Sequence, residues 1–356
     1  MSKNLFGSLL EKEYAYRASD IVEDLKDVVP DRSPFFSTSP YNSWGSAAGF
    51  QFGTMELLYG PKSSGKTMLA LDRIKMVQAT DPEIIAVFVD AEMSFEYEST
   101  IHWLKSNGVD TDRLLIVREV CIKKIFEEYI MRDIQLAIKT EGVKVGIIVM
   151  DSIQAMSVLN IPTTEVQIKK AGTKDGSVTK QDYGARANYI SRIMPFYRKF
   201  CRDNRVFTTF IGQARHGGTD RHGNLKWDTN GGEALFHEIQ YKTLVTPAGQ
   251  PIFSDTHKDA NGNPMKIGHR IKFVFEKNKM AEGQDRIGFT DIIYMKGIVN
   301  TEKELVELCS KIGVIQQAGA WFSYGEHRAQ GAEKMGELIK QNPEIYTELF
   351  IAMFRH

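Results

Sequence analysis

The sequence predicts an α/β protein with a mostly parallel sheet, and two observations carry this prediction. Short apolar runs cover residues 55–60, 84–92, 113–119, 145–152 and 205–213, and stretches with helical spacing lie between them. Strands that alternate with helices in this way are typical of parallel sheets. The runs are continuous rather than interrupted by polar residues, as expected of strands that are covered on both faces.

The composition is that of an ordinary globular protein. Of the 356 residues, 42% are hydrophobic and 25% are charged, and 45 basic residues balance 45 acidic ones. A nucleic-acid partner therefore requires a local basic surface. The three cysteines lie far apart, which argues against disulfide and zinc frameworks and fits a reducing cytoplasm. No apolar run approaches the roughly 18 residues of a membrane helix, and charges at residues 11–13 argue against a signal peptide.

Three regions are predicted along the chain. Residues 1–36 hold a short amphipathic helix (residues 3–18) and a proline-containing linker, residues 37–296 hold the apolar runs of the core, and residues 297–356 form a small C-terminal α/β domain. The first helix is expected to dock on a neighbouring copy of the chain through its apolar face. That face consists of Leu5, Phe6, Leu9 and Leu10.

A phosphate-binding loop follows the first apolar run. The segment GPKSSGKT (60–67) matches G-x-x-x-x-G-K-(S/T) between a strand and a helix, the context that this motif requires. The glycines let backbone N–H groups turn toward phosphate oxygens, the lysine reaches the β and γ phosphates, and the last hydroxyl binds Mg²⁺. The predicted nucleotide contacts here are Gly60, Pro61, Lys62, Ser63, Ser64, Gly65, Lys66, Thr67 and Met68.

Two carboxylates at strand ends complete this predicted site. Asp151 ends the run GIIVMD, where a residue that supports Mg²⁺ belongs in enzymes of this class. The predicted Mg²⁺ site is therefore Thr67 with Asp151. Glu92 ends the run FVDAE, where a carboxylate can polarise the attacking water. Asp90 lies two positions earlier and faces the same side of the strand, so it competes with Glu92 for this role.

Six parts of the chain, in this order, resemble the RecA family, which comprises the bacterial recombinase RecA and its phage-encoded UvsX-type relatives. They are STSPYNSWGSAAGFQFGTMELLYGPKSSGKT from residue 37, FVDAEMSFEYESTIHWLKSNGVD from residue 88, IIVMDS from residue 147, FIGQAR with TNGGEAL from residues 210 and 229, FEKNKM from residue 275, and IQQAGAWFSYGEHRAQG from residue 315. The likeness covers roughly residues 37–350. It implies a RecA-like ATPase core, and it is more specific than the phosphate motif alone.

The resemblance implies roles for residues around ATP and Mg²⁺. Lys66 and Thr67 bind phosphate and Mg²⁺, and Asp151 supports the metal. Glu92, rather than Asp90, activates the attacking water. Gln213, the last residue of its predicted strand, senses the γ-phosphate and orders the long polar loop behind it. The loop is thus expected to be a DNA contact that responds to ATP.

Two further implications concern the edges of the nucleotide site. Lys277 and Lys279, in FEKNKM, match the lysines that reach the ATP of the neighbouring subunit and stabilise charge on the transferred phosphoryl group. Trp103 stands where the family places an aromatic ring against adenine. Tyr97 is an alternative, because the stretch between Glu92 and Gly108 is longer than in the bacterial protein.

Two polar segments, about 164–185 and 211–230, are expected to face DNA. Their net positive charge is modest, but they combine basic donors with Leu225 and Trp227, which can stack on bases. The predicted DNA contacts are Lys169, Lys170, Lys174, Lys180, Arg186, Arg215, Arg221, Lys226, Trp227, Gly231 and Gly232.

The function implied is an ATP-dependent, DNA-stimulated recombinase that forms filaments on single-stranded DNA. It pairs that strand with a homologous duplex and exchanges strands in recombination and repair. Its expected partners are both DNA forms, copies of itself, and mediator and single-strand-binding proteins, in the cytoplasm of a bacterium or of a phage host. A longer first loop and no acidic tail favour a phage or accessory protein. Two alternatives stay open: a RecA-fold helicase, and a regulatory ATPase that acts on a protein partner.

Overall fold

The computed structural model describes residues 34–47, 49–95, 98–158, 180–219, 225–229, 233–280 and 286–355. The predicted helix at residues 3–18 and most of the first predicted DNA segment lie outside these ranges. Within the described part of the chain, no helix is both long and apolar enough to cross a membrane.

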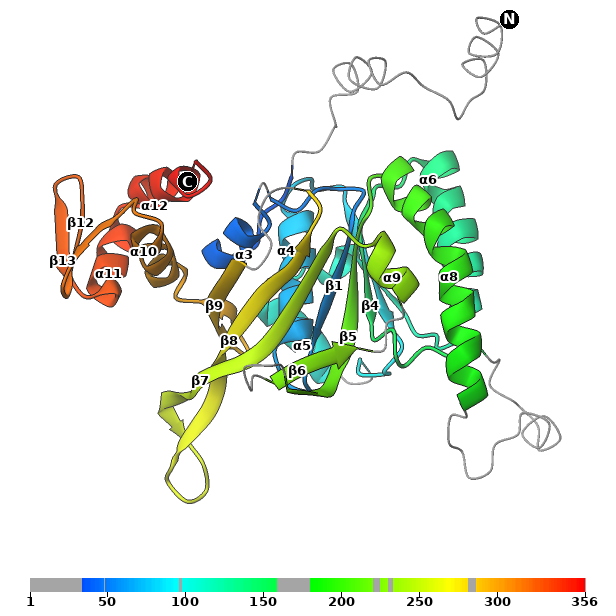
Figure 1. Ribbon diagram of the computed structural model, residues 1–356, viewed down its shortest axis with the longest axis horizontal. Helices are drawn as coiled ribbons and strands as arrows, with labels where there is room; N and C mark the ends of the chain where they lie inside the picture. Colours follow the sequence, from blue (N-terminus) through cyan, green and yellow to red (C-terminus); the bar gives the residue numbers. More distant parts are fainter. Residues whose placement is uncertain are drawn as a thin grey trace, which may run out of the picture. The chain divides into compact units, whose positions relative to one another are not determined.

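The centre of the fold is a parallel sheet, as the sequence predicts (Figure 1). Its strands are β1 (Met55–Gly60), β2 (Ile85–Asp90), β3 (Leu114–Val117), β4 (Val145–Asp151) and β5 (Phe207–Thr219), in the order β1-β5-β4-β2-β3. All four pairs in this series are parallel. The register sets Gly60 beside Gln213 and Asp90 beside Asp151, so the chemically important strand ends lie along one edge of the sheet.

The sheet continues beyond β1 with antiparallel strands. Strand β7 (Tyr241–Lys258) pairs in parallel with β1 and is followed by β8 (Pro264–Asn278), β9 (Arg286–Ile293) and β10 (Gly297–Val299). Strand β9 pairs with β8 only between Gly268 and Phe275. The distal part of the β7–β8 hairpin therefore extends past the other strands (Figure 1).

Helices cover both faces of the sheet and build two apolar cores. One core joins α4 (Lys66–Gln78) and α5 (Glu98–Ser106) to the sheet, and the other joins the π-helix η2 (Lys124–Ile134), α8 (Lys180–Asp203) and α9 (Glu233–Glu238). Neighbouring strand residues contribute to opposite cores, for example Phe88 to the first and Val89 to the second. This alternation explains why the central strands read as continuous apolar runs. Helix α6 (Gln135–Glu141) continues η2.

The C-terminal part combines helices with a small antiparallel sheet. It contains α10 (Thr301–Lys311), β11 (Gln316–Ala318), β12 (Trp321–Tyr324), β13 (His327–Gln330), α11 (Ala332–Gln341) and α12 (Pro343–Ala352). Helix α10 is tied to the core by the fully buried Glu304, which accepts hydrogen bonds from the Tyr41 N–H in α3 (Pro40–Gly45) at 2.8 Å and from the Thr290 hydroxyl at 2.7 Å. The domain boundaries near residues 36 and 296 stay a prediction.

Candidate nucleotide site and the adjoining polar segments

The phosphate motif forms the turn between β1 and α4. Gly65 stands before the helix with a φ of 91°, a left-handed conformation that glycine adopts without strain. A Cβ added to Gly60 would lie 1.9 Å from the Val245 carbonyl oxygen, so this position has no room for a side chain. Both glycines of the motif are thus required by the local backbone, and the turn leads directly to the N-terminus of a helix, which favours anions.

Lys66 folds back over this turn. Its ammonium donates to the Gly60 carbonyl at 3.1 Å, the Pro61 carbonyl at 2.7 Å and the Ser64 hydroxyl at 3.4 Å. Burial lowers the pKa of Lys66, while the negative charges of Asp151 and Glu92 act in the opposite direction. The cation lies within the turn that the sequence assigns to phosphate, and a phosphate there would compensate its burial.

Thr67 and Asp151, the predicted Mg²⁺ pair, lie next to each other. The Thr67 hydroxyl donates to Asp151 Oδ2 at 2.9 Å. Burial, reinforced by the charge of Glu92, raises the pKa of Asp151 to about 6, against the opposing effects of Thr67 and Lys66. Hard oxygen donors fit Mg²⁺, which commonly takes one or two protein oxygens and completes its shell with phosphate and water. Accordingly, the described residues contain no cluster of three or more His, Cys, Asp or Glu ligands.

The two competing carboxylates after β2 have different environments. Asp90 is fully buried and accepts hydrogen bonds from the Ser94 N–H, the Ser94 hydroxyl and the Phe95 N–H, at 2.9, 2.9 and 2.8 Å. It therefore caps the turn that follows the strand. Glu92 is exposed, lines a cavity with Thr67 and Asp151, and accepts hydrogen bonds from the Ser152 hydroxyl and the Gln213 side chain.

Gln213 links this carboxylate to the polar segment behind it. It is the last β5 residue in register with β1, and its Nε2 donates to Glu92 Oε1 at 3.1 Å. Its main-chain N–H donates to Oε1 of Gln154 at 3.2 Å. The side chain of Gln213 thus contacts a residue that lines the cavity, and its main chain leads into the paired part of the second predicted DNA segment.

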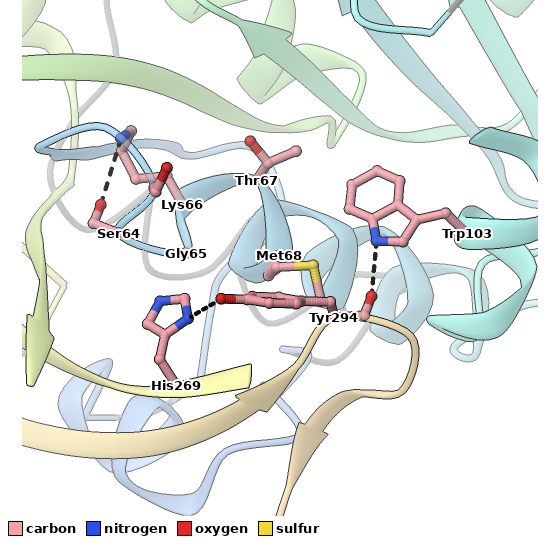
Figure 2. Close-up of a pocket in the computed structure, with 9 residues that line it drawn as sticks. Ser64, Gly65, Lys66, Thr67, Met68, Trp103, His269 and Tyr294 are labelled. Carbon is pink, nitrogen blue, oxygen red and sulfur yellow. Dashed lines mark hydrogen bonds between the residues drawn. The ribbon is translucent and has the colours of Figure 1, made fainter. Parts of the chain in front are cut away.

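A cavity of about 360 Å³ opens beside the phosphate turn. It is lined by Ser63, Ser64, Gly65, Lys66, Thr67, Met68, Trp103, His269 and Tyr294. Figure 2 shows the Trp103 indole N–H directed at the Tyr294 carbonyl, 2.8 Å away, and the Tyr294 hydroxyl 3.2 Å from His269 Nδ1. Tyr97, the alternative to Trp103, lies outside the described residues.

Sequence reasoning named Trp103 but missed His269 and Tyr294. Both come from the antiparallel half of the sheet, on β8 and just after β9, about 200 residues beyond the phosphate motif. The available signals were a histidine at the start of the run HRIKFVFE (269–276) and a tyrosine near the end of the run GFTDIIYM (288–295). A single aromatic residue in that position is common in cores and has no specific meaning on its own.

The second predicted DNA segment is partly a β-hairpin rather than a loop throughout. Strand β6 (Leu225–Thr229) pairs antiparallel with β5, with Arg215 opposite Asp228 and His216 opposite Trp227. Arg215 is exposed, and Trp227 is half-buried against the core cluster on the α8 face. Lys226 lies on the same strand. Arg221, Gly231 and Gly232 lie outside the described residues.

The first predicted DNA segment is described only at its two ends. Lys169, Lys170 and Lys174 lie outside the described residues, and Lys180 is the first residue of α8. Arg186 is 8% exposed, and its guanidinium donates to the carbonyls of Gln154 at 2.8 Å and Met156 at 3.4 Å. In this structure Arg186 ties the start of α8 to the chain that leaves β4.

Lys277 and Lys279 lie at the end of β8 and reach the C-terminal end of α9. Lys277 donates to the Phe236 carbonyl, and Lys279 donates to the His237 carbonyl at 2.8 Å. Partial burial, with the nearby charge of Lys279, lowers the pKa of Lys277 to about 8. The last carbonyls of a helix attract cations, so α9 holds the two lysines side by side at the sheet edge.

Comparison with known proteins identifies the family of this chain. The family model of the RecA N-terminal domain matches residues 42–299, and that of the RecA C-terminal domain matches residues 303–351. Protein RecA of Streptococcus mutans is 31% identical over 307 residues, which cover 85% of this chain and 71% of that protein. Protein RecA of Streptococcus agalactiae is 30% identical over 85% and 72%, and the chromosomal protein RecA of Lactococcus lactis subsp. lactis is 29% identical over 85% and 70%. The chain therefore belongs to the RecA family of recombinases.

Proposed function

We propose that this protein is an ATP-dependent, DNA-stimulated recombinase that forms filaments on single-stranded DNA and exchanges strands with a homologous duplex. One observation carries the proposal beyond family membership. The Gln213 side chain donates to Glu92 beside the phosphate turn, and Gln213 is also the root of the β5–β6 hairpin. Through Gln213, binding or hydrolysis of the nucleotide would change the position of the segment that carries the predicted DNA contacts.

Hydrolysis would use the residues that surround the phosphate turn. Lys66 and the backbone N–H groups bind the phosphates of ATP, and Thr67 with Asp151 would hold Mg²⁺. The metal, when bound, neutralises charge on the β and γ phosphates. Glu92 accepts a proton from the attacking water, because its carboxylate is exposed to the cavity. Gln213, bonded to Glu92, would move toward the γ-phosphate.

The base of ATP would occupy the cavity beside the turn. Trp103 and Tyr294 supply aromatic surface, and the hydrogen bond between them keeps the two residues together. His269 borders the same space and is 9% exposed. The proposal adds Tyr294 and His269 to the nucleotide contacts that the sequence predicts.

Nucleic acid would meet the edge of the sheet that carries the phosphate turn, and the ATP of the neighbouring subunit would meet the opposite edge. Arg215, Lys226 and Trp227 belong to the β5–β6 hairpin, where cations follow phosphates and an aromatic ring stacks on bases. Lys277 and Lys279, gathered at the end of α9, would reach the ATP of the next subunit. Such a shared site makes hydrolysis depend on filament formation.

The test is ATP hydrolysis with and without single-stranded DNA at low and moderate salt, followed by strand exchange. We expect strong stimulation that fades with salt, because phosphate contacts release counterions. Strand exchange should then require a homologous duplex, and a heterologous duplex is the control. The Lys66→Ala variant controls for contaminating ATPases. A rate indifferent to DNA, or unwinding without homology, would refute the proposal.

A further inference from the structure

Gln154 lies where three functional segments of the chain meet. It is the third residue after β4, in the stretch DSIQAM that leads into the first predicted DNA segment. Its side-chain Oε1 accepts a hydrogen bond from the Gln213 N–H at 3.2 Å, and its Nε2 donates to the Thr229 hydroxyl at 3.1 Å. Its carbonyl accepts a hydrogen bond from Arg186 at 2.8 Å. One residue thus contacts β5, β6 and α8.

Each of these partners is the root of a segment that the sequence assigns to DNA. Gln213 is where the β5–β6 hairpin begins, and Thr229 closes that hairpin opposite Ala214. Arg186 follows the first DNA segment, and Gln154 itself precedes it. Arg186 and Thr229 are 8% and 5% exposed, so their two contacts with Gln154 are partly sheltered from water, whereas the contact with Gln213 is exposed. Gln154 therefore contacts the ends of both segments: its side-chain amide bonds to β5 and β6, and its main-chain carbonyl bonds to Arg186.

The amide has both of its polar atoms engaged, which fixes its orientation. Its oxygen faces an N–H donor of β5, and its nitrogen faces the hydroxyl of β6. If the end of β5 shifts, the amide must follow or lose a hydrogen bond, and its contact with Thr229 changes with it. Because Gln213 also bonds to Glu92, the chain of contacts runs from the cavity through Gln213 and Gln154 to Thr229.

We propose that Gln154 is a positioning residue whose side-chain amide couples the nucleotide state sensed at Gln213 to DNA binding by the β5–β6 hairpin. The proposal rests on the proposed function, since it concerns the stimulation of ATP hydrolysis by DNA. Gln154 itself touches neither nucleotide nor the reacting atoms. Its loss should weaken the communication between the sites while leaving DNA-free hydrolysis intact.

The experiment compares three variants of the full chain with the wild type. Gln154→Met keeps the length of the side chain and removes both hydrogen bonds, Thr229→Val keeps the shape of the side chain and removes the hydroxyl, and the third variant combines them. We measure ATP hydrolysis without DNA, the maximal DNA-stimulated rate, and the DNA concentration at half stimulation. Melting temperatures control for folding.

Each single variant should keep its DNA-free rate within about twofold and lose about tenfold in DNA stimulation, which is a usual size for coupling between sites. The double variant should lose about as much as Gln154→Met alone, because Gln154→Met already removes the contact with Thr229. If Gln154→Met does not fold, Thr229→Val alone still tests the expected tenfold loss of DNA stimulation.

Three outcomes would overturn the proposal. Variants that DNA stimulates as strongly as the wild type would remove Gln154 from the coupling and leave the proposed function intact. Equal losses in the DNA-free and stimulated rates would indicate a merely structural residue. A wild-type protein that DNA does not stimulate would refute both the coupling and the proposed function, so the two failures are distinguishable.

Discussion

Two carboxylates only two residues apart acquire different roles through the turn that follows β2. Asp90 still belongs to the strand, and its oxygens satisfy the N–H groups of Ser94 and Phe95 as the chain turns. Glu92 lies beyond the strand, where its carboxylate reaches Gln213. A buried carboxylate whose oxygens accept three hydrogen bonds is engaged in stabilising the turn. On geometric grounds, Glu92 is therefore the better candidate for the proposed general base.

The variant Glu92→Gln should bind ATP and DNA but hydrolyse ATP about 10²–10⁴-fold more slowly, because a general base supplies a factor of that size. Nucleotide binding is measured with a fluorescent ATP analogue and turnover by phosphate release. The control is Asp90→Asn, which removes the competing carboxylate and should mainly lower the melting temperature. Wild-type turnover in Glu92→Gln would contradict the assignment.

At the scale of single residues, sequence motifs predicted the site where the chemistry is local. The turn from Gly60 to Thr67 requires glycine by conformation and space, and Asp151 is placed by a continuous apolar run that ends at the sheet edge. Tyr294 and Gln154 were missed, since their roles depend on what the fold brings beside them. A glutamine three residues after a strand has no periodicity or spacing that marks it.

At the scale of elements, the central strands were predictable and the polar hairpin was not. The apolar runs predict the bounds of β1, β2 and β4 and the start of β5 to within two residues, because strands that are buried on both faces require continuous apolar residues. The pairing of β6 with β5 places Arg215 opposite Asp228 and His216 opposite Trp227, in a stretch rich in glycine and charged residues. Such a hairpin is specified by register and turn, which composition does not reveal.

Helix α10 is held on the core by a buried acid. Glu304 accepts hydrogen bonds from the Ser39 hydroxyl, the Tyr41 N–H and the Thr290 hydroxyl, which come from the segment around α3 and from β9. Burial nevertheless raises the pKa of Glu304 from 4.5 to about 8. The native protein therefore retains a proton that the unfolded chain loses above pH 4.5, and the free energy of unfolding falls as pH rises from about 4.5 to about 8.

Replacement of Glu304 by Gln should remove this pH dependence. The amide keeps an acceptor for Ser39 and Tyr41 and can donate to the Thr290 hydroxyl. We expect the variant to exceed the wild type in unfolding free energy by about 1–3 kcal/mol at pH 9, and to match it near pH 5. Urea unfolding at both pH values measures the difference, and Glu302→Gln on the same helix controls for the lost charge. A difference that does not change with pH would contradict the prediction.

At the scale of the whole molecule, the two edges of the sheet carry different predicted contacts. The ends of β1, β2, β4 and β5 carry the phosphate turn, Glu92, Asp151 and Gln213, as parallel sheets usually place ligands at the carboxyl ends of their strands. The antiparallel extension brings Tyr294 to this edge, whereas α9 holds Lys277 and Lys279 at the opposite edge, beside the start of β1. The predicted nucleotide and DNA contacts therefore share one edge of the sheet, and the predicted contact with the neighbouring ATP lies at the other.

The segment from residue 34 onward contains both apolar cores and forms one compact unit. The predicted helix with Leu5, Phe6, Leu9 and Leu10 lies before this unit in the sequence, and we expect the core to fold without it. Deletion of residues 1–18 should therefore leave the circular dichroism spectrum and the melting temperature unchanged within a few degrees. Filaments on single-stranded DNA should disappear from electron micrographs, because the docking face is gone.

Leu9→Asp in the full chain keeps the length constant and should have the same effect, since a charge in an apolar interface is costly. Normal filaments from both variants would show that subunits join through other surfaces, and an unfolded truncated chain would show that the core depends on its N-terminal segment.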